Sequence, residues 1–148
     1  MTKNEIRRMN MLSTPSSVEE FVNAIFEDFP FKHWNEITEG YPVTNIYTNE
    51  KGDVKYEFAL TKFKEQEVNV TIENNILTIE AKRQEKNEEE KDGWKLISGR
   101  IKKESFTKRI RIPNHLNADK AEAKFNEGLL IITIPAKYEQ GKKRQLLG

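Results

Sequence analysis

The sequence predicts an all-β domain, a β-sandwich, preceded by a partly helical N-terminal arm and followed by a short flexible tail. Short stretches between residues 41 and 136 alternate apolar and polar side chains, as strands with one covered face do. Turn-forming residues such as Asn74 and Asn75 separate these stretches, and no helical pattern lies among them. We therefore expect an arm at 1–40, a sandwich domain at 41–136 and a tail at 137–148.

The arm carries an amphipathic pattern that predicts one helix at 17–29. Ser16 and Ser17 are candidate N-caps, each followed three residues later by a glutamate, and Pro30 ends the helix. Apolar residues recur at the spacing of one helical face, and two more aromatic residues follow the helix. These candidate residues are Val18, Phe21, Val22, Ile25, Phe26, Phe29, Phe31 and Trp34. Two interpretations stay open: the helix docks on its own domain, or the arm packs between subunits or on other proteins.

Strands are expected along the rest of the chain. The first is short enough to be an edge strand, and the continuously apolar run at 129–134 is typical of a strand covered on both faces. A charged loop at 83–93, with five acidic and three basic residues, precedes a long strand rich in bases that Pro113 ends. The expected strands are 43–48, 54–60, 68–72, 76–80, 100–112, 121–125 and 129–134.

Composition limits the class of protein. The 148 residues suit one domain, and with 36% hydrophobic and 33% charged residues part of the chain must be solvated or packed on other subunits. The net charge of +1 argues against a general nucleic-acid-binding protein. The absence of cysteine excludes disulfides and thiolate chemistry, and fits a reducing compartment. Neither a membrane-spanning run nor a signal peptide is visible, so we expect a cytoplasmic protein.

The side chains that carry catalysis lack a recognisable arrangement. His33 and His115 have no metal-ligand spacing, and no glycine-rich phosphate loop occurs. Ser105, His115 and Asp119 have the residue types of a hydrolase triad, but no nucleophile elbow frames the serine. The bases at 100–111 are expected to pair with the acidic loop or a neighbouring subunit rather than with nucleic acid. We therefore expect no catalytic residue, no metal ion, no cofactor and no nucleic-acid partner.

Four segments between residues 41 and 130 carry recognisable motifs. The segment 123–130, AKFNEGLL, resembles the A-x-x-x-n-G-v-L signature of the small heat-shock proteins, the α-crystallin family. The segment 106–113, FTKRIRIP, resembles its F-x-R-x-F-x-L-P element, with Lys108 in place of the arginine. Residues 41–46, YPVTNI, are similar to the opening of bacterial class A members, and 60–63, LTKF, stand where those have L-P-G-F.

The resemblance implies an immunoglobulin-like sandwich, the α-crystallin domain, and an ATP-independent holdase that binds partly unfolded client proteins and prevents their aggregation. It also implies a dimer and a large homo-oligomer, encoded by a bacterium or a phage. The apolar arm supplies a sticky surface and the charged remainder supplies solubility, which suits such an activity. The alternatives are a CS-domain type of co-chaperone adaptor that binds folded partners, and an enzyme built on a β-sandwich.

The resemblance also implies particular sites. The dimer is expected to form by strand exchange through the loop at 83–99, with Asp92 and Gly93 as turn and Trp94 as apolar anchor. The loop would pair with the edge strand of the partner. A groove for docking of the C-terminal tail is expected at Val68, Val70, Ile72, Ala121, Ala123 and Phe125. The tail anchor is Leu146 with Leu147, and we expect weak docking because adjacent side chains of an extended segment point to opposite sides.

Overall fold

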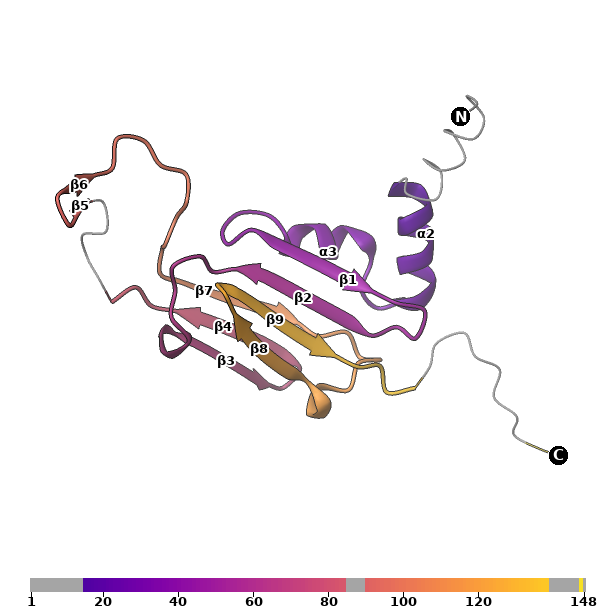
Figure 1. The fold of residues 1–148 in the computed structure, drawn as a ribbon. Helices are drawn as coiled ribbons and strands as arrows, with labels where there is room; N and C mark the ends of the chain where they lie inside the picture. Colours follow the sequence, from indigo (N-terminus) through magenta and orange to yellow (C-terminus); the bar gives the residue numbers. More distant parts are fainter. Residues whose placement is uncertain (1–14, 85–89, 139–146, 148) are drawn as a thin grey trace, which may run out of the picture.

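Two antiparallel sheets pack face to face, and two short helices lie across one side of them (Figure 1). This computed structural model describes residues 15–84, 90–138 and 147. The predicted all-β sandwich is confirmed. The helices are α2 (Pro15–Ile25) and α3 (Phe31–Ile37), with short 3-10 turns η1 (Glu65–Glu67) and η2 (Ala118–Lys120). The strands are β1 (Thr44–Thr48), β2 (Val54–Ala59), β3 (Val68–Glu73), β4 (Ile76–Ala81), β5 (Glu90–Lys91), β6 (Trp94–Lys95), β7 (Phe106–Arg111), β8 (Glu122–Asn126) and β9 (Leu129–Ile134).

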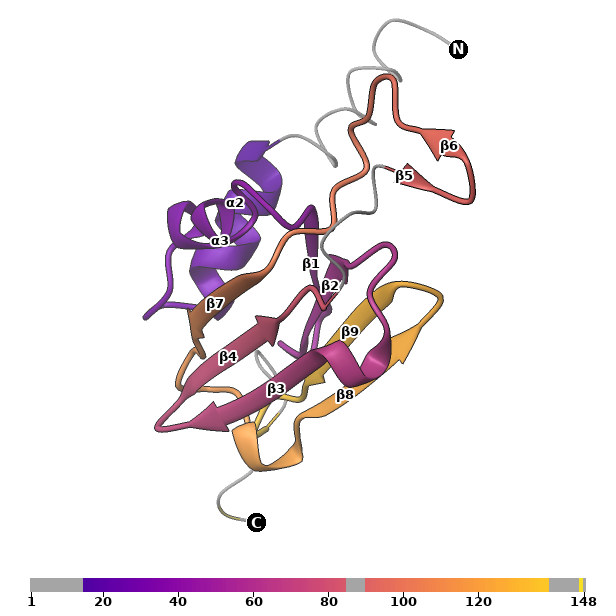
Figure 2. The same cartoon turned by 90° about the vertical axis from the view of Figure 1, so that its left-hand side faces the viewer.

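Each of the two main sheets has two edge strands, and each edge strand of one sheet lies beside an edge strand of the other. One sheet has the order β1-β2-β9-β8 and the other the order β3-β4-β7. Edge strands β3 and β8 lie along one side of the sandwich, whereas β1 and β7 lie along the other side, beneath the helices (Figure 2). The predicted edge position of the first strand is therefore confirmed. Backbone groups on the outer side of β1 have no strand partner in the described part of the chain.

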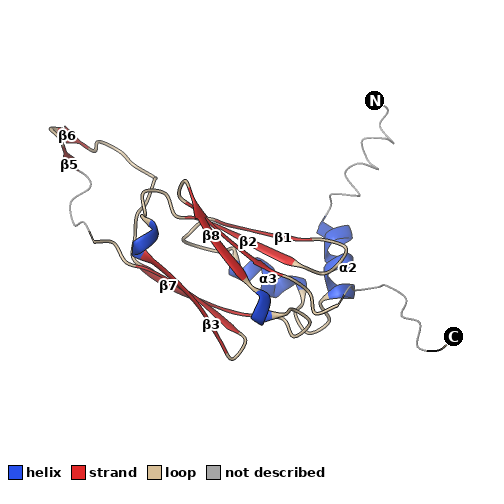
Figure 3. Ribbon diagram, turned by 60° about the horizontal axis from the view of Figure 1, so that its bottom comes forward, coloured by secondary structure: helices blue, strands red, loops and turns tan. Residues whose placement is uncertain are grey.

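The charged loop contains a small hairpin of its own. β5 and β6 pair with each other, and the turn between them is made by Asp92 and Gly93, both at positive φ. The turn that the sequence predicts at these two residues is thus confirmed. This hairpin extends beyond one end of the sandwich, and α2 lies at the other end (Figure 3).

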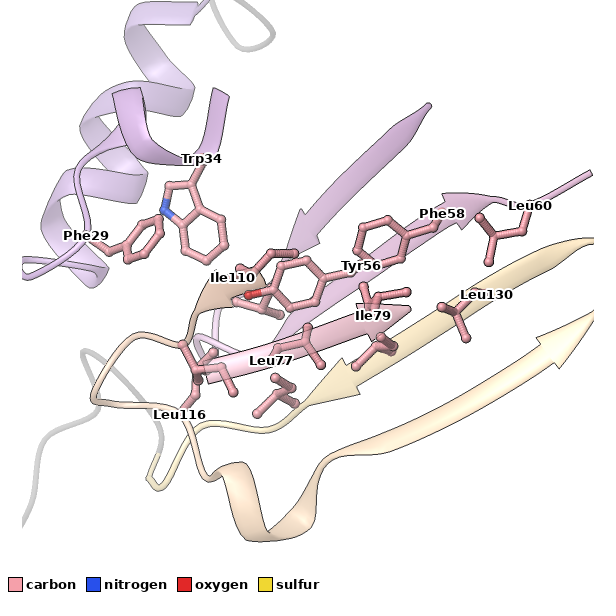
Figure 4. Close-up of a cluster of buried hydrophobic side chains, with 14 of the residues drawn as sticks. Phe29, Trp34, Tyr56, Phe58, Leu60, Leu77, Ile79, Ile110, Leu116 and Leu130 are labelled. Carbon is pink, nitrogen blue, oxygen red and sulfur yellow. The ribbon is translucent and has the colours of Figure 1, made fainter. Parts of the chain in front are cut away.

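The core lies between the sheets and continues under the helices (Figure 4). Alternate residues of β2, β4 and β9 point inward and are almost fully buried, each worth about 1.5–3 kcal/mol on the usual scale of burial. Their buried members include Tyr56, Phe58, Leu77, Ile79, Leu130 and Ile132. The β3–β4 hairpin turns at Asn74 and Asn75, whose positive φ values of 53° and 60° are ones that asparagine tolerates well.

Two strand predictions are wrong in part. The strand expected at 100–112 covers only Phe106–Arg111, because its neighbour β4 ends at Ala81, which already pairs with Phe106. Residues 100–105 therefore have no strand beside them in the described chain. The run at 129–134 was expected to be covered on both faces, but only alternate residues of β9 are buried, because no described layer covers the outer face of this sheet.

The helix predicted at 17–29 ends earlier than expected, and a second helix, which the sequence did not predict, follows Pro30. α2 ends at Ile25, and a turn leads through Pro30 into α3. Pro30 restricts the residue before it and has no N–H to donate, so a continuous helix is interrupted there. Ser16 and Ser17 lie inside α2 rather than at its N-cap, since its described bounds begin at Pro15.

Candidate functional site

The helical arm is docked on the sandwich. Val22, Phe26, Phe29 and Trp34 are buried and belong to the same hydrophobic core as the strands. The ring of Trp34 lies 5.1 Å from that of Phe26 and 4.6 Å from that of Phe29, between ring centroids. The first interpretation of the arm, a helix on its own domain, therefore describes this subunit. With the arm docked, almost all of the surface of these four side chains is covered.

Polar contacts hold the turn between the helices against β7. The Asp28 carboxylate lies 3.6 Å from the guanidinium of Arg111 and accepts a hydrogen bond of 3.0 Å from the backbone N–H of Asn114. Arg111 also donates to the carbonyl of Asp28 at 2.8 Å and lies 4.7 Å from the ring centre of Phe29. These contacts connect residues that are more than eighty positions apart in the chain, so they define where the arm docks.

Lys108 holds the end of α3. Its ammonium group donates a hydrogen bond to the carbonyl of Ile37, the last residue of the helix, where a positive charge is favourable. Partial burial lowers the pKa of Lys108 below its ordinary value. The lysine that replaces the family's arginine thus serves as an attachment point for the arm.

His115 packs beneath the arm. Its ring lies 4.4 Å from that of Phe26, and its Nε2 lies 3.1 Å from the carbonyl oxygen of Gly52. Nε2 therefore carries the proton, and the buried Nδ1 has no hydrogen-bond partner among the described residues. Burial lowers the pKa of His115, and this effect outweighs the Gly52 carbonyl and Asp28, which raise it; Lys137 lowers it further.

A largely apolar pocket of about 550 Å³ lies between the two helices and β1. Its walls include predicted arm residues that stay accessible, since Val18 is 41% exposed and Phe21 is 39% exposed. Ile46 and Tyr47 line it from β1, and Trp34 lines it from α3. Ile25 and Phe31 are half-buried. The arm therefore presents an apolar surface even when it is docked.

The connection between β6 and β7 is a second exposed apolar surface. Trp94 is 80% exposed and Ile97 is 99% exposed, and Leu96 and Ile101 are also exposed. Trp94, predicted as an apolar anchor, thus packs against little of its own chain. Residues 85–89 of the predicted dimer loop lie outside the described residues.

A buried ion pair between Glu67 and Lys103 fixes the two ends of the connection from β4 to β7. The Glu67 and Lys103 side chains are only 2% and 4% exposed, and Lys103 Nζ lies 3.2 Å from Glu67 Oε1. The Glu67 carboxylate also accepts hydrogen bonds from the backbone N–H groups of Lys64 at 2.8 Å and Gln84 at 3.3 Å. Burial raises the pKa of Glu67, but these hydrogen bonds and Lys103 together lower it below its ordinary value. Since Gln84 leads into the loop and Lys103 leads out of it, one carboxylate holds both.

The tail groove is predicted between β3 and β8, two edge strands that lie along the same side of the sandwich (Figure 2). Val68, Val70 and Ile72 share one face of β3 and are half-buried. Phe125 and Ala121 are also half-buried, but Ala123 is exposed. The structure therefore places both strands of the predicted groove on the same side of the sandwich, and docking of the tail between them stays a prediction. Leu146 lies outside the described residues, and Leu147 is exposed.

The candidate triad residues do not form a site. Ser105 and His115 flank opposite ends of β7, whose six residues at about 3.3 Å each separate them by roughly 20 Å. The Ser105 hydroxyl instead accepts a hydrogen bond from the backbone N–H of Arg83. In the described part of the chain, no group of three acidic or histidine side chains could hold a metal ion. No helix among the described residues is long and apolar enough to cross a membrane.

Comparison with known proteins decides the family. Residues 46–146 match the sequence model of the Hsp20/alpha crystallin family. This chain belongs to that family. Small heat shock protein C2 of Rickettsia felis is 32% identical over 97% of this chain and 88% of the relative. The 17.8 kDa class I heat shock protein of Arabidopsis thaliana is 29% identical over 84% of this chain and 87% of the relative.

Solved structures of small heat-shock proteins have the same fold. Heat shock protein 16.0 from Schizosaccharomyces pombe superimposes with a TM-score of 0.53 and 26% identity, covering 74% of this chain and 99% of the other. A small heat shock protein from Synechococcus phage S-ShM2 superimposes with a TM-score of 0.55 and 19% identity, over the same shares of each chain. Membership of the small heat-shock protein family implies a chaperone function and does not favour the adaptor alternative.

Sequence reasoning missed two features of this small heat-shock protein, helix α3 and the buried Glu67–Lys103 pair. Helix α3 was signalled by Pro30 followed by apolar residues three positions apart, at Phe31, Trp34 and Ile37. The Glu67–Lys103 pair had no local signal, because the partners are thirty-six positions apart and only the fold brings them together.

Proposed function

We propose that this protein is an ATP-independent holdase that binds partly unfolded client proteins and keeps them from aggregating. The observation that supports it is the accessible apolar surface of the arm, at Val18 and Phe21, on a chain in which one residue in three is charged. Such a surface binds exposed apolar segments of a client, and the surrounding charges keep the complex soluble. Binding the unfolded state requires no nucleotide, because it acts by mass action.

The other apolar residues of the arm are largely covered in the docked state and become fully accessible only when the arm is released. Val22, Ile25, Phe26, Phe29, Phe31 and Trp34 are buried or half-buried against the sandwich. Their docking depends on the contacts of Asp28 and Lys108, so warming that loosens those contacts exposes more apolar surface. We propose that this release adds to client binding.

Assembly is proposed to begin with a dimer. β1 offers a free sheet edge, and the segment after β6 is exposed and apolar without a strand partner among the described residues. If this segment of one subunit pairs with β1 of another, the edge of β1 gains a strand partner and the apolar side chains of the segment are covered. Docking of the tail, through Leu146 or Leu147, in the groove between β3 and β8 then connects dimers into larger homo-oligomers. We place the protein in the cytoplasm of a bacterium, encoded by the host or by a phage.

The test is an aggregation assay without ATP. A thermolabile enzyme is heated with and without the purified full-length protein, and light scattering is recorded. We expect the protein to suppress scattering increasingly as its ratio to the client rises, and Phe21→Ser to need several times more protein for the same effect. Glu20→Ser, an exposed change on the same helix, is the matched control and should behave like the wild type.

Point substitution is preferable to removing the arm. Deleting residues 1–40 would take Phe26, Phe29 and Trp34 out of the core, so a loss of activity could reflect unfolding. A wild-type protein that fails to reduce light scattering at any ratio would refute the holdase proposal.

A further inference from the structure

The apolar pocket between α2, α3 and β1 lies directly beside the outer edge of β1, which pairs with no other strand among the described residues. Ile46, Tyr47 and Thr48 of β1 form one wall, and Val18 and Phe21 of α2 form another. A strand added to the outer side of β1 would therefore run past the mouth of this pocket. Those of its side chains that point toward the helices would enter it.

The segment at 96–102 of the chain has the pattern such a strand needs. Ile97 and Ile101 are four residues apart, so in an extended strand they point to the same side. Both are exposed, Ile97 by 99%. Leu96 points to the other side, which makes it a matched reference position for the two isoleucines.

Charge also matches the segment to the arm. Residues 15–40 hold six acidic residues and one basic residue, a net charge of −5. Residues 94–104 hold four basic residues and one acidic residue, a net charge of +3. The segment is therefore attracted to the helices that border the pocket.

The segment is held away from the pocket of its own subunit. The hydroxyl of Tyr41 contacts the carbonyl of Lys102 at 3.3 Å and the N–H of Glu104 at 3.2 Å, and Lys103 is paired with buried Glu67. From this attachment the chain extends beyond the end of the sandwich opposite α2 (Figure 1, Figure 3). A second subunit related by a two-fold axis can instead supply the segment, and the contact then occurs twice.

We propose that the pocket formed by α2, α3 and β1 receives Ile97 and Ile101 of a second copy of this chain. This inference rests on the dimer proposed above and extends it from backbone pairing to a side-chain contact that includes the arm. The docked arm then forms part of the dimer interface. Clients that bind Phe21 compete with the second subunit for the same pocket.

Cross-linking of full-length variants tests this contact, because the natural chain has no cysteine. Phe21→Cys and Ile97→Cys proteins are mixed and treated with a short bismaleimide. We expect a covalent dimer in the mixture, at several times the yield of either variant alone. The mixture of Phe21→Cys with Leu96→Cys is the matched control and should give little. Equal yields from the two mixtures would overturn the proposal. A cross-link from the thiol of the Phe21→Cys variant to another segment of its own subunit, in place of one between subunits, would also overturn it.

Affinity supplies an independent measurement. Ile97→Ser should raise the dimer dissociation constant by about 100-fold or more, because the loss occurs at both symmetric contacts. Leu96→Ser should change it by less than about tenfold. Sedimentation distinguishes a failure of the pocket contact from a failure of the dimer proposal. If the wild type is a dimer and Ile97→Ser is an equally stable dimer, only the pocket contact is refuted. A wild-type protein without a dimer refutes the proposed assembly as well, and light scattering of the heated client reports on the holdase separately.

Discussion

Replacing Lys103 with methionine should destabilise the subunit, because it leaves the buried carboxylate of Glu67 without its cation. Removing one partner of a buried ion pair costs about 3–5 kcal/mol. Glu67 keeps its two backbone hydrogen bonds, from Lys64 and Gln84, so we expect a loss near the lower limit, about 3 kcal/mol. For a chain of 148 residues this corresponds to a fall in Tm of about 6–12 °C.

The double variant Glu67→Gln/Lys103→Met separates the charge from the packing. Glutamine still accepts the hydrogen bond from Lys64, and methionine fills the space of the lysine stem without a charge. Replacing both ions with neutral groups of similar shape is often neutral, so the double variant should lie within about 1 kcal/mol of the wild type. Urea unfolding at a fixed subunit concentration measures all three proteins.

The pH dependence of the free energy of unfolding tests whether the charged form of Glu67 stabilises the fold. The folded protein holds the pKa of Glu67 below its ordinary value of 4.5, so its contribution is present above that pH. It is lost as the pH falls through the folded pKa, and the double variant should not show this loss. A double variant as unstable as Lys103→Met, or a Lys103→Met protein within about 1 kcal/mol of the wild type, would refute the reasoning.

Three further predictions concern the arm and the tail. Because burial lowers the pKa of His115 below 6.5, the free energy of unfolding should fall as the pH drops below that value, and His115→Asn should remove this dependence in urea titrations. Phe26→Ala should cost about 3–5 kcal/mol and speed hydrogen exchange in α2, whereas exposed Val18→Ala should not; equal exchange would contradict the docked arm. Leu146→Ala should loosen the oligomers in native mass spectrometry, and Leu146→Ile with Gly148→Ile should tighten them; three identical masses would show that the tail adds nothing.

The order of strands along the chain could be predicted because alternation is a local property. In β2 the apolar residues stand at every second position, which identifies both the strand and its buried face. The turn at Asn74 and Asn75 was predictable for the same reason, since positive φ is tolerated by asparagine itself. The motif around Gly128 was enough to indicate the family, which comparison then confirmed.

The destination of the arm could not be predicted from its pattern. An apolar stripe shows that one face of a helix is covered, but a stripe that packs on its own sandwich looks the same as one that packs on a partner. Here the decision came from distant residues: Arg111 and Lys108 of β7 and His115 after it hold α2 and α3 in place. None of these contacts lies within the arm, so the arm's own sequence could not distinguish the two interpretations.

The limits of the strands were also a matter of tertiary structure. The basic segment at 100–105 has a sequence compatible with a strand, yet a strand exists only where a neighbour supplies hydrogen bonds, and β4 ends opposite Phe106. The sequence by itself therefore determined which segments can be strands, where the chain turns and to which family it belongs. The tertiary structure alone decided that the arm completes the core, that one buried carboxylate clamps both ends of the loop, and that the segment after β6 is left exposed. These depend on residues far apart in the chain, whose proximity no local pattern encodes.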